Sequence, residues 1–379
     1  MLRKPLSLGL LVVAGCGGPP LVEDWRAAEP RSAPVRCETH RGTVLRVDGE
    51  LYEGVPTALA STDWAADQTW KSAVQGPGGW WISEVGGYSY VSGQRQGNLA
   101  WLKEGSTAPE LVAKGSYAGV AVTRDGVFAV RGDCPKDVRN TAASNLMILE
   151  QFEVTADGIS GPIERARWTG FCPRYATVDR DDRVLVVGLA TIGLGPADTP
   201  ELVTIDGDAL RWVGSLPSDA WSGERILGPQ MEVAPTGDLI FSAGISFPAD
   251  DPEAMPSRVV RPGPGGALAM GVLVGECRPG PDLEPLPPAA PERALGLHME
   301  ADEPLVSATL LAWASVTDAI EHLRSRGEPV ELALMDIPLN AREVELLLRL
   351  PAGSRLTRYE HSLDEASVSA LSARRPDLL

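Results

Sequence analysis

Basic charge, histidine and long apolar runs are all scarce in this sequence. Lysine and arginine total 34 against 51 aspartate and glutamate residues, which gives a formal net charge of −17. An acidic surface repels phosphate backbones, and the sequence contains no basic stripe with interleaved aromatic residues. The composition therefore argues against nucleic acid as a partner. The longest apolar stretches of the body, 184–195 and 305–316, fall short of the roughly 18 residues that a membrane-spanning helix needs.

The sequence contains neither of two common hydrolase motifs. Four histidines occur, and none stands in a His-x-x-x-His pattern, while Gly-x-Ser-x-Gly is also absent. Nucleophilic and zinc-dependent hydrolysis therefore have no support in the sequence. An active site assembled from residues on several strands would leave no compact motif, so an enzyme stays open as the alternative to a binding protein.

The N-terminus has the layout of a secretion signal. Arg3 and Lys4 precede a short apolar stretch at 5–13, and small residues lead to Cys16. This resembles the lipobox of bacterial lipoproteins, which implies that residues 1–15 are removed and that Cys16 carries lipid. An ordinary signal with a chance cysteine is the other interpretation. Because Gly17 stands where an inner-membrane retention aspartate would stand, the resemblance implies the outer membrane, with the body facing the periplasm or the cell exterior.

The residues after Cys16 differ in character from the signal. Residues 16–36 are rich in glycine, proline, alanine and charge, and they show no periodicity. Such a composition is typical of a flexible tether between a lipid anchor and a folded body.

Residues 37–312 contain a repeated pattern. Four segments begin with a valine, continue through a polar turn and end in a short apolar strand; they start at Val74, Val122, Val178 and Val233. A further strand follows each valine after 23 or 24 residues. A turn residue that tolerates positive φ between apolar residues favours a hairpin, and a hairpin needs neighbours to bury its face. The pattern therefore predicts four-stranded units packed side by side.

Units of this size are similar to the blades of β-propellers. The resemblance implies a mainly β fold, a ring of about five four-stranded blades. A fifth unit would begin at Met299, after a proline- and glycine-rich insertion at 262–293, and a hairpin at 43–52 would help to close the ring. A sandwich or another antiparallel stack is the competing architecture.

The expected pairing of the cysteines follows from this layout. Beyond Cys16 an even number remains, which in an oxidising compartment indicates two disulfides with three possible connectivities. We favour Cys134–Cys172, which would join adjacent blades, and Cys37–Cys277, which would clasp the two ends of the ring. A metal site on Cys37-x-x-His40 is the rival, but it lacks a second ligand pair.

Residues 313–379 have a different periodicity. Amphipathic helices are predicted at 316–323, 339–346 and 363–371, each after a polar cap, with strands at 330–334 and 355–359 between them. The tail resembles leucine-rich repeats, although without their asparagine ladder. A plain α/β cap packed on the propeller explains it equally well.

Two groups of side chains are candidates for ligand contacts. Trp80, Trp81 and Trp101 lie in the first unit, where they would either fill the blade or stack on a sugar or a partner's loop. The acidic turn 179–182 carries three aspartates that could bind calcium, but it lacks the glycine and distal glutamate of an EF-hand. We expect no other metal or cofactor.

The sequence thus favours a lipid-anchored envelope protein that presents propeller loops to a protein or glycan partner. The alternative is a propeller enzyme, of the lyase, cyclotransferase or quinoprotein type, with a site dispersed over several blades.

Overall fold

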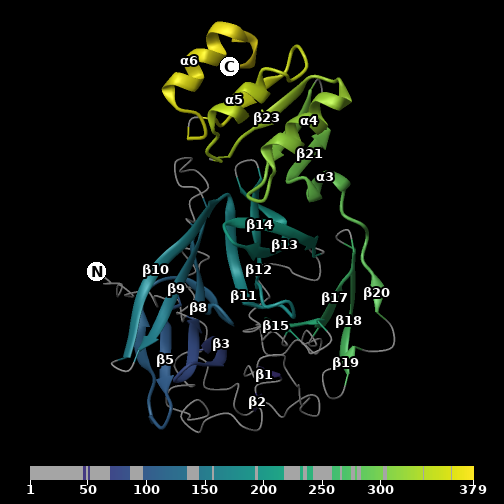
Figure 1. Cartoon of the computed structure of the whole chain (residues 1–379). Coiled ribbons are helices and arrows are strands. Elements are labelled where there is room, and N and C mark those ends of the chain that lie inside the picture. Colours follow the sequence, from purple (N-terminus) through teal and green to yellow (C-terminus); the bar gives the residue numbers. More distant parts are fainter. Residues whose placement is uncertain are drawn as a thin grey trace, which may run out of the picture.

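The fold is taken from a computed structural model of the chain. The structure describes residues 46–47, 50–51, 69–85, 97–134, 145–155, 158–192, 195–216, 231–233, 237–241, 258–264, 267–274, 278–279, 283–301, 305–335, 337–359 and 361–379. These residues form a mainly β body and a smaller α/β module at the C-terminal end (Figure 1).

Antiparallel meanders make up the body, as the repeats predict. The first meander comprises β3 (Thr69–Gly76), β4 (Gly79–Val85), β5 (Leu99–Lys103) and β6 (Glu110–Ala113). The second comprises β7 (Tyr117–Thr123), β8 (Gly126–Asp133), β9 (Leu146–Thr155) and β10 (Gly158–Thr169). The third comprises β11 (Phe171–Val178), β12 (Val184–Ile192), β13 (Gly195–Asp206) and β14 (Ala209–Ser215). The fourth comprises β15 (Met231–Val233), β16 (Leu239–Phe241), β17 (Arg258–Pro262) and β18 (Leu268–Val274).

The turn between the first two strands of each meander has the backbone geometry that the sequence pattern requires. Gly78, Gly126, Asp182 and Gly237 all have positive φ in these turns. Glycine adopts that region freely, and aspartate tolerates it better than most residues. The prediction of four hairpins is therefore confirmed.

The meanders lie side by side through their first strands. β7 pairs with β11 in parallel at Gly119 and Ala176, which joins the second and third meanders into an eight-stranded sheet. β3 lies against β7, and β15 lies against β11. Among the described strands no pairing joins the first meander to the fourth. Closure of the meanders into a ring therefore stays a prediction.

The prediction of a fifth blade is wrong. β21 (Leu297–Ala301) and β22 (Val306–Leu310) form the hairpin that the pattern at Met299 predicts, but they pair with strands of the C-terminal module. The structural boundary between body and module therefore precedes β21 and does not lie at 312. The proline- and glycine-rich segment 262–293 contains β18, the last strand of the fourth meander. It also contains β19 (Arg278–Pro279) and β20 (Glu284–Pro285), and α3 (Pro291–Ala294) begins at its end.

The C-terminal module alternates strands and helices, as predicted. β22, β23 (Val330–Ala333) and β24 (Arg355–Thr357) are parallel. The helices are α4 (Val316–Arg326), α5 (Ala341–Leu347) and α6 (Glu365–Arg374), followed by the short 3₁₀ helix η4 (Pro376–Leu378). Ser315, Asn340 and Asp364 cap the three α-helices with their side chains, which satisfies first-turn N–H groups.

The parallel strands of the module follow one another at a constant interval. Val306 pairs with Val330, and Glu331 pairs with Arg355, so neighbouring strands advance by 24 residues. The Ser354 hydroxyl accepts the Val330 N–H from the previous repeat at 3.1 Å. The module has its own core, which includes Leu332, Leu356 and Leu378.

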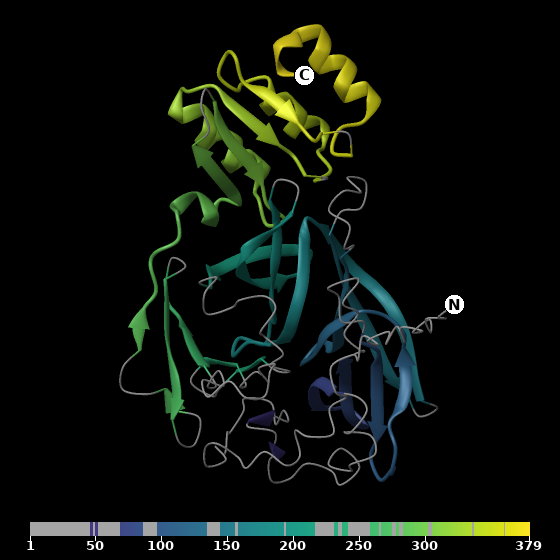
Figure 2. The same ribbon diagram turned by 180° about the vertical axis from the view of Figure 1, so that it is seen from behind.

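Both views of the molecule place the module beyond the end of the third meander, near β13 and β14 (Figures 1 and 2). At the opposite end of the chain, β1 (Arg46–Val47) pairs with β2 (Glu50–Leu51), which confirms the predicted hairpin at 43–52. Within the described segments, no helix combines the length and the apolar character needed to cross a membrane.

Candidate functional site

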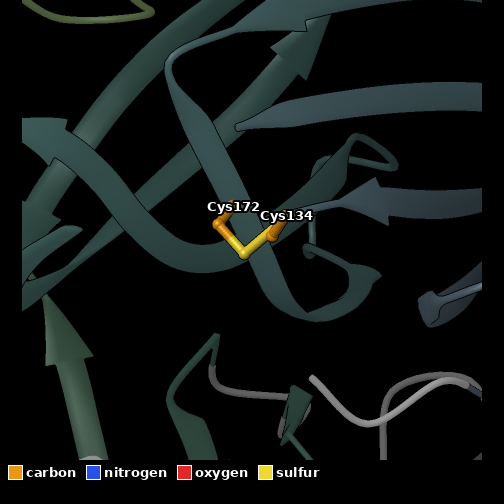
Figure 3. The surroundings of a disulfide bond; sticks show 2 residues. All are labelled: Cys134 and Cys172. Atoms are coloured by element: carbon orange, nitrogen blue, oxygen red, sulfur yellow. A yellow bond between two sulfur atoms is a disulfide. The ribbon is translucent and has the colours of Figure 1, made fainter. Parts of the chain in front are cut away.

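The disulfide predicted between Cys134 and Cys172 is present (Figure 3). Cys134 directly follows β8 and Cys172 is the second residue of β11, so the bond joins the second and third meanders. The two Cα atoms are 5.7 Å apart, and both side chains are buried. Cys16, Cys37 and Cys277 lie outside the described residues, so lipidation and the second disulfide stay predictions.

The three tryptophans do not form an exposed stacking platform. Trp81 is fully buried and Trp101 is 5% exposed, and both belong to the core between the first and second meanders. Their ring centroids are 6.4 Å apart, and Trp81 also packs on Phe152 at 5.8 Å. These two residues therefore have the packing role that the sequence also allowed. Trp80 is only half-buried, on the other face of β4.

The acidic turn binds protein donors instead of presenting free oxygens. Asp179 Oδ1 accepts the N–H groups of Asp181 and Arg183, and its Oδ2 accepts Arg183 Nε at 2.9 Å. Asp182 Oδ2 accepts the N–H of Arg124 from the neighbouring meander's turn. In the parts of the chain that the structure describes, no three histidine, cysteine or carboxylate side chains gather as a metal site. The calcium hypothesis therefore gains no support at this turn.

A group of interacting side chains lies where the module joins the third meander. We call this region the joint; it comprises Phe171, Glu201, Trp212, Ser215, Arg293, His298, Glu300 and Trp313. Its apolar part is an edge-on contact between Phe171 of β11 and Trp313, with ring centroids 6.2 Å apart. Trp313 Nε1 donates to the backbone oxygen of Arg293 at 2.8 Å. Trp313 belongs to the core of the meanders, although it follows a strand of the module.

The polar part of the joint is centred on Glu201 of β13. This carboxylate is fully buried, and its Oε2 accepts Ser215 Oγ at 2.5 Å and Trp212 Nε1 at 2.8 Å. Its Oε1 lies 3.3 Å from Arg293 Nη1, which comes from α3 on the other side of the joint. Neither of these last two atoms has a hydrogen bond of acceptable geometry.

Arg293 continues the network towards solvent. Its Nη2 donates to His298 Nδ1 at 2.8 Å, and His298 Nε2 lies 2.7 Å from Glu300 Oε1. Because a guanidinium can only donate, His298 Nδ1 accepts and the proton of the neutral ring is on Nε2. Side-chain exposure rises along this network towards solvent, from 0% at Glu201 to 14% at Arg293, 20% at His298 and 55% at Glu300.

Burial dominates the electrostatics of Glu201. It raises the pKa of this carboxyl, while the Arg293 charge and the bonds from Ser215 and Trp212 lower it without prevailing. A raised pKa in a carboxyl is a property of general acids. Here the carboxyl faces a guanidinium and two donors, however, so its atoms are engaged in a packed contact between two parts of the chain.

A second buried network lies within the second meander. The Tyr117 hydroxyl donates to Glu150 Oε2 at 2.6 Å, and Arg131 Nε donates to Glu150 Oε1 at 2.8 Å. Burial, and then the bond and charge of Glu150, raise the pKa of the Tyr117 phenol well above its usual range. All three side chains come from adjacent strands, so the group crosslinks one sheet.

The sheet of the C-terminal module has one polar face. Val330 and Leu332 of β23 point into the module's core, so Glu331 between them points to the opposite face. The register places Ser307, Glu331 and Arg355 in one row, with Glu300 of β21 opposite Ser307. We call these four residues the sheet-face row. Arg355 is exposed, and the side chain of Glu300 is 55% exposed.

Sequence reasoning missed the joint. Glu201 was recognisable only as the first residue of a predicted strand, and Arg293 lay in a segment assigned to the insertion. Nothing in the periodicity links these two positions, which are 92 residues apart in the sequence. Trp313, which is 20 residues from its bonded partner Arg293, carried no signal beyond its size.

Comparisons with known proteins add little to this description. No family model matches the chain, and no curated protein matches it. A solved structure, the periplasmic gluconolactonase of Pseudomonas aeruginosa, is similar over 62% of this chain and 72% of its own, with 12% identity and a TM-score of 0.24. At this TM-score the likeness carries no argument about fold or function.

Proposed function

We propose that this chain is a lipid-anchored envelope protein that binds a protein or glycan partner. The observation that carries the proposal is that the buried side chains with a raised pKa, Tyr117 and Glu201, already contact polar or charged side chains of the chain itself. Glu201 and the Tyr117–Glu150–Arg131 group are each bonded to neighbouring side chains in packed regions. A propeller enzyme needs several ionised groups that face one shared space.

The proposed binding surface is the sheet-face row of the C-terminal module. The core of the module and the joint fix the position of this face relative to the body, so a partner would meet a preorganised surface. Its mixture of two carboxylates, a hydroxyl and a guanidinium suits a polar partner that offers both donors and acceptors. Protein loops and glycans both have that chemistry.

Photo-crosslinking in the native host tests this surface. A photoreactive residue at position 331 should give a discrete crosslinked species, and Arg355→Glu should weaken it by reversing the charge of the row. Position 342 is the matched control, because Arg342 is exposed on α5 away from the row. Equal crosslinking from 331 and 342, or none from 331, would contradict the proposed surface.

The lipid anchor is a separate part of the proposal. The lipobox-like segment supports it, and the Cys134–Cys172 disulfide is what an oxidising compartment favours. Cys16→Ser should leave the precursor uncleaved or move the protein from the outer-membrane fraction to the soluble fraction. Unchanged membrane association of that variant in fractionated cells would refute the anchor.

A further inference from the structure

The joint places a fully buried carboxylate between two parts of the chain. Glu201 belongs to β13 of the third meander, whereas Arg293, His298 and Glu300 belong to α3 and β21. The 3.3 Å approach of Arg293 Nη1 to Glu201 Oε1 is the ion pair that crosses the joint. Any change in the charge of Glu201 therefore acts on the contact between body and module.

The ion pair is not strong enough to offset the burial of Glu201. The pKa of Glu201 is raised above its ordinary value because burial outweighs Arg293, the two hydrogen bonds and His298 together. A buried ion pair whose desolvation penalty exceeds its attraction is a known balance in protein interiors. In the closed joint, the ionised form of Glu201 is therefore disfavoured relative to its ionised form in water.

We propose that the joint is proton-linked: protonation of Glu201 strengthens the docking of the C-terminal module, and ionisation of Glu201 weakens it.

The sign follows from linkage. When the joint opens, Glu201 meets water and its pKa returns towards the ordinary value, so the closed joint binds more protons than the open one. Closure is therefore favoured at low pH, and this advantage is lost as pH rises from the ordinary carboxyl value through the raised one. Each pKa unit by which Glu201 differs between the open and the closed joint corresponds to about a tenfold change in the opening equilibrium.

His298 is the other ionisable side chain that contacts Arg293. Its Nδ1 accepts a hydrogen bond from Arg293 Nη2, and its Nε2 lies against Glu300 Oε1. Among the described residues, this network contains Glu201, Arg293, His298 and Glu300. Beside it, Glu292 of α3 lies within 4 Å of His322 and Arg326 of α4. An experiment must therefore separate Glu201 from His298.

Hydrogen–deuterium exchange of the full chain between pH 5 and pH 8, corrected for intrinsic exchange rates, measures the opening of the joint. Peptides that cover 168–176 and 308–316 should be more protected at pH 5 than at pH 8. Peptides from α5 and α6 are the internal control, because they lie in the module's own core. Equal corrected protection of the joint peptides at both pH values would overturn the proposal.

Three variants assign the effect. Glu201→Gln imitates the protonated acid and keeps an oxygen for Ser215 and Trp212, so its joint should stay protected at every pH. Lower protection than wild type at pH 8 would instead show that the ion pair holds the joint together, and the proposal would fail. Arg293→Met should move the transition to higher pH, because it removes the strongest charge that favours ionised Glu201. An unmoved transition in that variant would count against the proposal.

His298→Gln is the matched control for the neighbouring imidazole. Its pH dependence should persist with the same sign, because Glu201 is unchanged. If the dependence disappears in His298→Gln, the histidine and not the carboxyl controls the joint. None of these measurements needs a binding partner, so they are independent of the proposed function.

Discussion

Trp313→Ala tests whether the joint is a true core contact between body and module. Trp313 is 7% exposed, packs edge-on against Phe171 at 6.2 Å and donates to the Arg293 backbone oxygen at 2.8 Å. The substitution removes the indole from the meander core and leaves that oxygen without its partner. Both losses fall on the joint and not on the module's own core.

The magnitude can be worked from these contacts. Truncation of a buried tryptophan to alanine costs about 3–5 kcal/mol, of which an aromatic pair accounts for about 0.5–1.5 kcal/mol. We therefore expect the free energy of unfolding to fall by about 4 kcal/mol in Trp313→Ala. Trp313→Phe keeps a ring against Phe171 and loses the N–H, so it should cost about 1–3 kcal/mol.

Urea denaturation of the wild type, Trp313→Ala, Phe171→Leu and the double variant forms a double-mutant cycle. Because the two rings are in contact, the losses should be non-additive by about 0.5–1.5 kcal/mol. A loss below about 1 kcal/mol in Trp313→Ala, or strict additivity in the cycle, would refute the view that these rings hold body and module together.

Three further outcomes are expected. Cys134→Ala should lower the free energy of unfolding by about 4 kcal/mol in the chain-entropy model for a separation of 38 residues, and adding Cys172→Ala should cost little more; additive losses in thermal denaturation would contradict the pairing. Gly119→Ala should cost about 1–3 kcal/mol or more by calorimetry, because its Cβ would collide with a backbone oxygen of β11, and a neutral result would contradict the close approach. Asp364 has a pKa lowered chiefly by its bond with Ser367, so its capping of α6 is present above the ordinary carboxyl pKa and is lost as pH falls through the lowered one. Circular dichroism should show that pH dependence in the wild type and not in Asp364→Ala; identical profiles would disprove it.

Local chemistry made the strands and helices predictable. The turns that begin the meanders contain Gly78, Gly126, Asp182 and Gly237, and each adopts the positive φ that its neighbours' pattern implied. The helix caps of the tail were equally readable, because a cap and its helix are adjacent in sequence. One disulfide was also predicted, since the repeat placed Cys134 and Cys172 at the same end of adjacent meanders.

The same pattern misled where a partner strand decided the outcome. Met299 lies in a hairpin like those of the meanders, but β22 pairs with β23 and thereby joins the module. A hairpin pattern specifies which residues form two strands and does not specify the sheet that they extend. Trp81 and Trp101 show the parallel limit for side chains, because the sequence could not distinguish a buried tryptophan from an exposed one.

The sequence by itself determined the repeating turns, the helix caps, the acidic surface and the absence of compact catalytic motifs. These properties depend on neighbouring residues or on composition. Only the tertiary structure decided that β21 and β22 leave the body, that Trp313 enters its core, and that Glu201 meets Arg293. The physical reason is that burial and charge pairing depend on distances between residues far apart in the chain, which only the folded packing sets.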